Sequence, residues 1–125
     1  MHGLHLTADL YRCRCDSAWL TEAARLGPWC VQALQAAGLP VVGQLFHSFA
    51  PADRGPGGAM VMVLAPDAQL CLRTWPAQQG VTIDVQAGKV PPDRAAQARA
   101  LMDALVGLFA PEWTEQRSLE RGDGQ

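Results

Sequence analysis

Apolar and polar positions along the chain predict five β-strands separated by turn residues. Residues 3–13 alternate between apolar and polar, as in a strand buried on one face. Residues 59–64 are almost wholly apolar, as in a central strand, and a Pro/Gly-rich loop at residues 51–58 precedes them. Pro66-Asp67-Ala68-Gln69 predicts a tight turn before the next strand. The predicted strands are residues 3–13, 41–49, 59–64, 70–75 and 81–85.

Two segments show helical spacing instead. Apolar residues recur at this spacing from Ala24 to Ala37, where Gly27-Pro28 interrupts the pattern. The helix therefore either begins at Pro28 or kinks there. A second apolar stripe runs from Ala96 to Phe109, behind a helix start at Asp93.

The order of these elements favours an α+β two-layer sandwich, with a mainly antiparallel sheet and helices on one face. The chain has 125 residues, enough for one hydrophobic core. We assign residues 1–112 to a single domain. Residues 113–125 are predicted to form a polar C-terminal tail, which frays from Arg117 to Gln125.

Composition narrows the function classes. Apolar residues make up 49% of the chain and charged residues 18%, which predicts a folded protein. A net charge of -2 with a single Lys, Lys89, argues against nucleic-acid binding. We expect no metal site, because no second Cys or His pair lies near Cys13 and Cys15 in the sequence. No membrane helix and no secretory signal are recognisable, so we expect a cytoplasmic protein with reduced cysteines.

Residues 64–76, LAPDAQLCLRTWP, end in an uncommon Thr-Trp-Pro corner. This segment resembles the self-cleavage segment of the bacterial S-adenosylmethionine decarboxylases, L-A-E-S-H-[IL]-[ST]-I-H-T-W-P-E. Residues 3–13 resemble the opening of that family, G-x-H-L-x-x-[DE]-[LF]-Y-x-C, and residues 42–49 resemble its V-x-x-x-F-H-x-F motif. The three motifs occur in the family's order, and the resemblance covers Gly3 to about Gly88.

The resemblance also implies what has been lost. In the family, a Ser cleaves its own peptide bond and becomes the pyruvoyl group that accepts electrons from the substrate. Ala68 occupies the position of this Ser, Asp67 that of the preceding Glu, and Arg73 that of a His that assists processing. Ala68 has no nucleophile, and an arginine cannot serve as a base. We expect an uncleaved chain without a pyruvoyl cofactor.

Two further family positions differ. A Glu that holds the substrate's ribose is replaced by Ala77, and the Cys that donates a proton is replaced by Gly88. With Ala68 and Arg73, these losses affect separate steps of one mechanism. We therefore expect that the chain does not decarboxylate S-adenosylmethionine.

Cys71 leaves an active enzyme open as an alternative. A thiolate three residues after Ala68 could act in self-cleavage or as a general acid, with His5, His47 and Asp67 as possible helpers. However, a Cys between Leu70 and Leu72 is more typical of a small buried apolar residue. This alternative is a decarboxylase for S-adenosylmethionine or another amino-acid-like substrate.

A second alternative is a small-ligand sensor with a remodelled pocket. Phe49 matches the family aromatic that stacks on adenine, although it could instead close the core. Arg73 in place of His favours an anionic ligand such as a carboxylate. The candidate ligand-binding residues are Phe49, Asp67, Arg73, Trp75 and Asp84.

Oligomeric state follows from the resemblance as well. Bacterial family members are homodimers whose sheets pack face to face, and Leu and Met on both faces of the predicted strands fit this arrangement. We expect a homodimer, or a heterodimer with an active paralogue. The favoured function is a non-catalytic or regulatory homologue in polyamine (spermidine) biosynthesis, with an active paralogue or a spermidine synthase as the partner.

Overall fold

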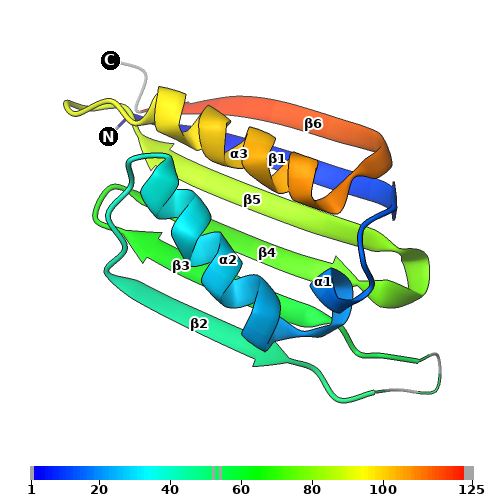
Figure 1. Cartoon of the computed structure of the whole chain (residues 1–125). Helices are drawn as coiled ribbons and strands as arrows, with labels where there is room; N and C mark the ends of the chain where they lie inside the picture. Colours follow the sequence, from blue (N-terminus) through cyan, green and yellow to red (C-terminus); the bar gives the residue numbers. More distant parts are fainter. Residues whose placement is uncertain (1, 52, 54, 123–125) are drawn as a thin grey trace.

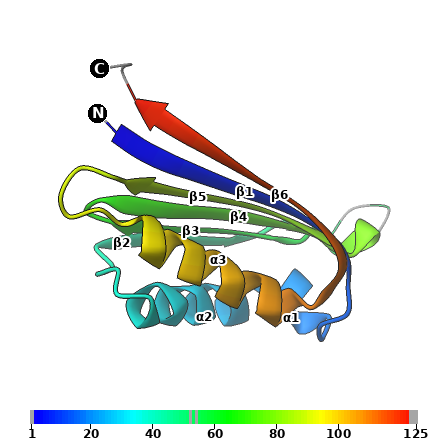
Figure 2. The ribbon, with the colours of Figure 1, turned by 90° about the horizontal axis from the view of Figure 1, so that it is seen from above.

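Antiparallel strands form one layer of the molecule and helices form the other (Figures 1 and 2). The computed structural model describes residues 2–51, 53 and 55–122. The strands are β1 (His2–Cys13), β2 (Gly43–Ser48), β3 (Ala59–Ala65), β4 (Ala68–Trp75), β5 (Gly80–Gly88) and β6 (Pro111–Gly122). The helices are α1 (Ala18–Thr21), α2 (Ala23–Ala36) and α3 (Ala95–Phe109), and a 3-10 turn, η1 (Pro76–Gln78), follows β4. The α+β two-layer fold predicted from the sequence is confirmed.

The sheet has the strand order β2-β3-β4-β5-β1-β6, and every neighbouring pair is antiparallel. The first strand, β1, thus lies between β5 and β6, although these are far away in the sequence. Val63 pairs with Leu70, Leu70 with Val85, and Val85 with Leu6. This register places the apolar members of each alternating pattern on one face of the sheet.

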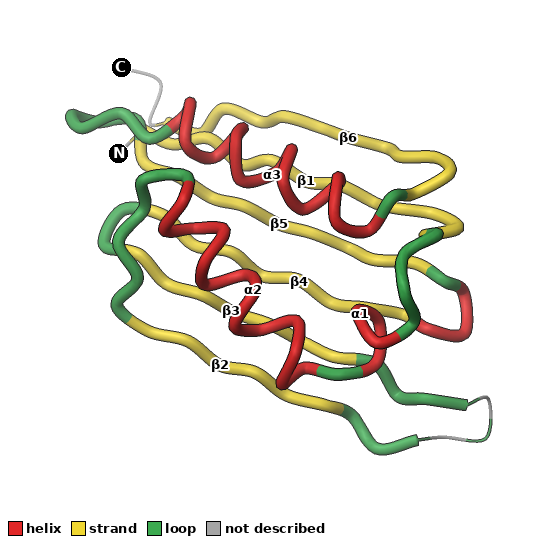
Figure 3. The backbone as a smooth tube through the Cα atoms, viewed as in Figure 1, coloured by secondary structure: helices red, strands yellow, loops and turns green. Residues whose placement is uncertain are grey.

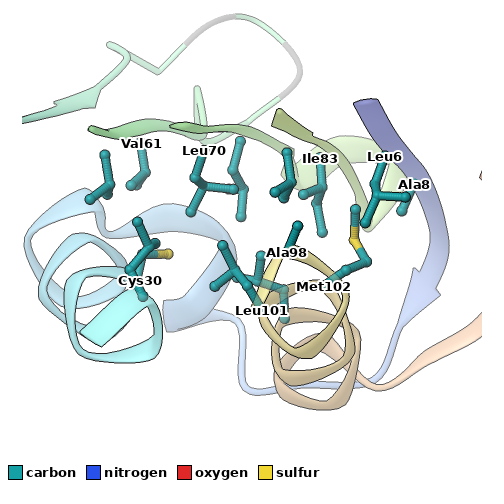
Figure 4. Packing of buried hydrophobic residues seen from close by; sticks show 14 of the residues in the cluster. Leu6, Ala8, Cys30, Val61, Leu70, Ile83, Ala98, Leu101 and Met102 are labelled. Carbon is teal, nitrogen blue, oxygen red and sulfur yellow. The ribbon is translucent and has the colours of Figure 1, made fainter. Parts of the chain in front are cut away.

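The hydrophobic core fills the space between this face and the helices. In Figure 4, Cys30 of α2 and Ala98, Leu101 and Met102 of α3 point toward the sheet. Strand residues of the same cluster are fully buried opposite them: Ala8, Val61, Leu70, Ile83. The apolar stripe predicted for the second helix is therefore a core face. In the described ranges, no helix is long and apolar enough to cross a bilayer.

The other face of the sheet carries no helix, as Figure 2 shows. We call it the open face. Its side chains are those that alternate with the core residues along each strand: His5, Thr7, Asp9 and Tyr11; Leu45 and His47; Met60, Met62 and Leu64; Gln69, Cys71, Arg73 and Trp75; Thr82, Asp84 and Gln86; Trp113, Glu115, Arg117 and Leu119.

The predicted polar tail is wrong in its described part. Residues 111–122 form β6, which pairs with β1 from His2↔Gly122 to Cys13↔Pro111 (Figure 3). β6 is an edge strand with β1 as its neighbour. Backbone hydrogen bonds to β1 stabilise it, so its sequence does not need to alternate between apolar and polar residues. The predicted domain boundary at 112 falls inside β6; residues 123–125 lie outside the described residues.

The first predicted helix begins earlier than Pro28. α2 starts at Ala23 and continues through Pro28, so a helix start at Pro28 is wrong. A side chain at Gly27 would clash with the Phe46 ring. The glycine therefore allows the helix to lie directly on β2.

Candidate functional site

The Pro66-Asp67 turn joins β3 to β4 in a tight hairpin. Ala65 pairs with Ala68 across the hairpin, and Ala68 pairs with Ala87 on the other side. The Ala68 side chain is 9% exposed and lies on the helix-covered face. The predicted tight turn is confirmed, and Ala68, which the motif resemblance assigns to the family's cleavage position, is an ordinary β-strand residue.

The Asp67 side chain is bonded to the residue at the start of helix α3. Its Oδ2 accepts a hydrogen bond of 2.8 Å from Nε of Arg94, the residue just before α3. The two side chains are 28% and 21% exposed, and among the described residues Asp67 Oδ1 is buried without a partner. The Asp67 carbonyl also accepts the N–H of Gly88 at 2.8 Å. Asp67 thus ties the turn to β5 and α3.

A pocket of about 330 Å³ lies beside this turn. Residues at the start of β1, at the end of β5 and around the β3–β4 turn line it, including Asp67, Ala68, Gln86 and Gly88. A side chain at Gly88 would begin 3.5 Å from the Asp67 carbonyl oxygen, an ordinary contact. The backbone therefore has room for a cysteine at Gly88, the residue that the motif resemblance implies at this position in the family.

Arg73 lies toward the other end of β4, between two aromatic rings. Its Cζ is 3.8 Å from the centroid of Phe49 and 4.4 Å from that of Trp75. Trp75 Nε1 donates to Thr82 Oγ1 at 3.2 Å, and His47 meets the Phe49 ring edge-on with centroids 4.7 Å apart. Three of the predicted ligand residues, Phe49, Arg73 and Trp75, are thus brought together.

Asp67 and Arg73 are separated by most of β4. At about 3.3 Å per residue, six residues of strand span about 20 Å, so Asp67 does not share a site with the Arg73 cluster. Asp84 lies between the two and pairs with Cys71 across β4 and β5. The predicted ligand residues are therefore spread along the sheet and not gathered in one pocket.

Asp84 has its own partner on β1. His5 Nε2 and Asp84 Oδ1 form a hydrogen bond of 2.9 Å. Burial, followed by the negative charge of Asp84, raises the pKa of the Cys71 thiol. A raised pKa leaves little thiolate near neutral pH, so Cys71 is a weak nucleophile.

The remaining helpers proposed for Cys71 are also dispersed. His47 is on edge strand β2 and His5 on β1, four strands away in the sheet order, which corresponds to about 19 Å at 4.8 Å per strand. Burial raises the pKa of Cys13 to about 11 and that of Cys30 to about 12. Among the described residues, no three His, Cys, Asp or Glu side chains are placed to hold a metal ion.

Comparisons with known proteins agree with this fold and this sequence. The family model described as S-adenosylmethionine decarboxylase matches residues 4–122. The chain belongs to the S-adenosylmethionine decarboxylase family. The resemblance inferred from three motifs is confirmed, and the match reaches through β6, beyond the motifs that end near Gly88.

Two relatives and one solved structure show how similar the chain is to known members of the family. An S-adenosylmethionine decarboxylase proenzyme of Persephonella marina is 29% identical over 122 residues, covering 96% of this chain and 82% of the relative. One from a Hydrogenobaculum species is 26% identical over 120 residues, covering 96% and 81%. The crystal structure of the Aquifex aeolicus adenosylmethionine decarboxylase matches with a TM-score of 0.81 at 25% identity, covering 98% of this chain and 92% of that one.

Within this family frame, the sequence reasoning missed two residues with structural roles. Thr74, in the Thr-Trp-Pro corner, is fully buried; its Oγ1 donates to the Leu20 carbonyl at 2.6 Å and accepts the Ala59 N–H at 2.8 Å. A polar residue at a core position of the β4 alternation was the available signal. Arg94 had no such signal, because its partner Asp67 is distant in the sequence.

Proposed function

We propose that this chain is a non-catalytic member of the S-adenosylmethionine decarboxylase family, which acts in polyamine (spermidine) biosynthesis as a regulatory partner. The observation that carries the proposal is Ala68, a buried methyl group in a regular strand, where the family has its self-cleaving Ser. Without that hydroxyl, the Asp67 carbonyl has no adjacent nucleophile. We infer that no pyruvoyl group forms.

Cys71 is a poor substitute for the missing hydroxyl. Three residues of strand separate it from Ala68 by about 10 Å, and an odd spacing places the two side chains on opposite faces of the sheet. The raised pKa of Cys71 adds to this difficulty. These observations support the non-catalytic proposal over an active decarboxylase that relies on Cys71.

Exposed apolar side chains on the open face support a partner. Leu45, Leu64, Trp75, Trp113 and Leu119 are each at least 40% exposed there. Large apolar side chains exposed to this extent on a sheet face without helices fit a surface that a partner covers. We propose that this face binds a second copy of the chain or an active paralogue.

Intact-mass spectrometry tests the missing cleavage. We expect a single uncleaved chain after prolonged incubation, and no CO2 from carboxyl-labelled S-adenosylmethionine. A matched variant that restores all four family positions, Ala68→Ser with Arg73→His, Ala77→Glu and Gly88→Cys, reports whether the frame still supports processing. Two fragments with a pyruvoyl-capped amino end in the unsubstituted protein would overturn the proposal.

Affinity purification from the native cells tests the regulatory role. We expect an intact decarboxylase paralogue or a spermidine synthase to co-purify in stoichiometric amount and to change its rate when the purified proteins are mixed. Recovery of the chain without either enzyme, or mixing without any change in rate, would contradict this role.

A further inference from the structure

We infer that Cys13 and Cys15 form a two-sulfur binding site for a soft monovalent metal ion, Cu(I). The inference goes beyond the proposed function, because it holds whether or not the chain cleaves itself or binds an enzyme partner. It rests on a cavity that both thiols line and on the backbone geometry that turns them to the same side.

The backbone changes its phase at the end of β1. Along the strand the even-numbered residues face the core, as far as Leu10. Arg12 has a left-handed backbone, with φ of 51°, and its side chain is exposed. The next residue, Cys13, is therefore the one that turns inward, and it is 3% exposed.

Beyond Arg12 the chain is extended. The Cys13 N–H donates to the Gln79 carbonyl at 2.9 Å, just before β5, and the Arg14 N–H donates to the Ala110 carbonyl at 3.1 Å, just before β6. Because β5 and β6 flank β1 on opposite sides, successive N–H groups point in opposite directions, as in a strand. Residues two apart in a strand share a face, so Cys13 and Cys15 point the same way, with Arg14 exposed between them.

A cavity of about 310 Å³ lies where the end of β1 passes α1 and η1 (Figure 1), and both cysteines line it. Cys13 belongs to the hydrophobic core, and the half-buried Cys15 packs against that core, on the side of the sheet away from the open face. One sulfur is therefore deep and the other is accessible to an ion from solution. The other described residues that line the cavity carry no charge, among them Ser17, Leu20 and Thr21.

The spacing of the two thiols suits a bridging ion better than a disulfide. Two residues apart in an extended chain, the Cβ atoms lie about 7 Å from one another, whereas a disulfide needs Cβ atoms about 3.8 Å apart. A direct bond between the sulfurs would therefore require the backbone to move. An ion between them adds two metal–sulfur bonds to the link and fits the wider gap.

The ligand set selects a soft ion of low coordination number. Thiolates favour Cu(I), whereas structural zinc takes four ligands. Among the described residues, no third His, Cys, Asp or Glu is placed to join the pair. Asp16, the next residue, instead accepts the Ala18 N–H with its Oδ1 at 3.1 Å. The expectation of no metal site rested on the absence of a second pair of ligands, which a two-coordinate ion does not need.

The protonation of the pair is consistent with a bound cation. Burial, followed by the negative charge of Cys15, raises the pKa of Cys13 to about 11. A cation between the two sulfurs replaces this repulsion by attraction, and its binding releases the thiol protons.

An anaerobic competition assay tests the site. The full-length protein, with its thiols reduced, is titrated with Cu(I) against the coloured chelator bicinchoninate, and native mass spectrometry counts the ions on each chain. We expect one Cu(I) per chain. Cys15→Ala and Cys13→Ala should each weaken its binding by at least about 100-fold, because each removes one of two ligands. Zn(II) should bind at least about 100-fold more weakly than Cu(I).

Cys71→Ala is the matched control, since it removes another half-buried thiol and should leave the Cu(I) affinity unchanged. Circular dichroism and the unfolding midpoint verify that each variant is folded. If Cys13→Ala unfolds, Cys15→Ala carries the test, because Cys15 is only half-buried. Any of four results would overturn the inference: no Cu(I) bound at one ion per chain, one ion shared between two chains, Zn(II) bound as tightly as Cu(I), or Cys15→Ala binding as tightly as Cys71→Ala.

Discussion

Replacing Thr74 by Val removes a buried hydroxyl and leaves the shape of the side chain nearly unchanged. The hydroxyl connects three elements: Thr74 itself is in β4, the Ala59 N–H that it accepts begins β3, and the Leu20 carbonyl to which it donates is in α1. The Ala59 N–H has no main-chain acceptor on β2. Ser48 lies opposite Ala59, but the backbone hydrogen bond beside this pair joins the Phe49 N–H to the Gly58 carbonyl. The substitution therefore leaves one donor and one acceptor unpaired.

Each unpaired buried group costs about 1–3 kcal/mol. Because α1 is a single short turn that can move toward water, we expect the two groups together to cost about 2–4 kcal/mol. Thr74→Ser keeps the hydroxyl and removes one buried methyl, which costs about 1 kcal/mol. The serine variant is therefore the matched control.

Urea unfolding, followed by tryptophan fluorescence and far-UV circular dichroism at one protein concentration, measures both variants. With a slope of about 2 kcal/mol per molar urea, Thr74→Val should lower the midpoint by about 1–2 M. The reasoning is refuted if the valine variant lies within about 0.5 kcal/mol of the unsubstituted protein, or if serine and valine are equally destabilising.

Three further predictions concern the turn, the thiol and the last strand. Arg94→Gln should lower the free energy of unfolding by about 1 kcal/mol in the same urea assay, because Asp67 loses a charge-assisted hydrogen bond that is partly exposed. Asp84→Asn should speed alkylation of Cys71 by iodoacetamide at pH 8 several-fold, since it removes a charge that raises the thiol pKa. Truncation after Ala110 should lower the unfolding free energy by at least about 3 kcal/mol, because it removes the ladder of β6 on β1.

Each of these has its own control. Arg94→Lys keeps the charge and should recover part of the loss; equal stability of all three proteins would contradict the role of the ion pair. Peptide mapping separates Cys71 from the buried Cys30, whose rate should stay low in both proteins. An unchanged Cys71 rate in Asp84→Asn would mean that burial alone raises its pKa. The truncated protein is compared with a chain that ends at Gly122, and equal midpoints would contradict the contribution of β6.

The core strands were predictable because burial on one face imposes a period of two residues. β3 and β4 obey it, as Val61 and Val63 and then Leu70 and Leu72 all point toward the helices. β6 was missed for the converse reason: it lies at the edge of the sheet, its described side chains are mostly exposed, and the backbone pairing with β1 leaves no mark in the sequence pattern.

The candidate site was only partly predictable. Asp67 and Arg73 are close in sequence, yet the extended conformation of β4 separates them along the sheet. Phe49 is distant from Arg73 in sequence, yet the pairing of β2 with β3 and of β3 with β4 brings its ring onto the guanidinium. Motif positions identify which residues differ from the family, whereas strand register decides which of them meet.

The positions at which the motif resemblance implies a difference from the family are positions that the fold can exchange. Ala68 fills a strand position that needs only a small side chain, and Gly88 has room for a larger one. Thr74, which holds α1, β3 and β4 together, is still present. Arg73 is held differently, because its Cζ lies 3.8 Å from the Phe49 ring centroid and 4.4 Å from that of Trp75. The contact with these two rings needs no catalytic base at this position.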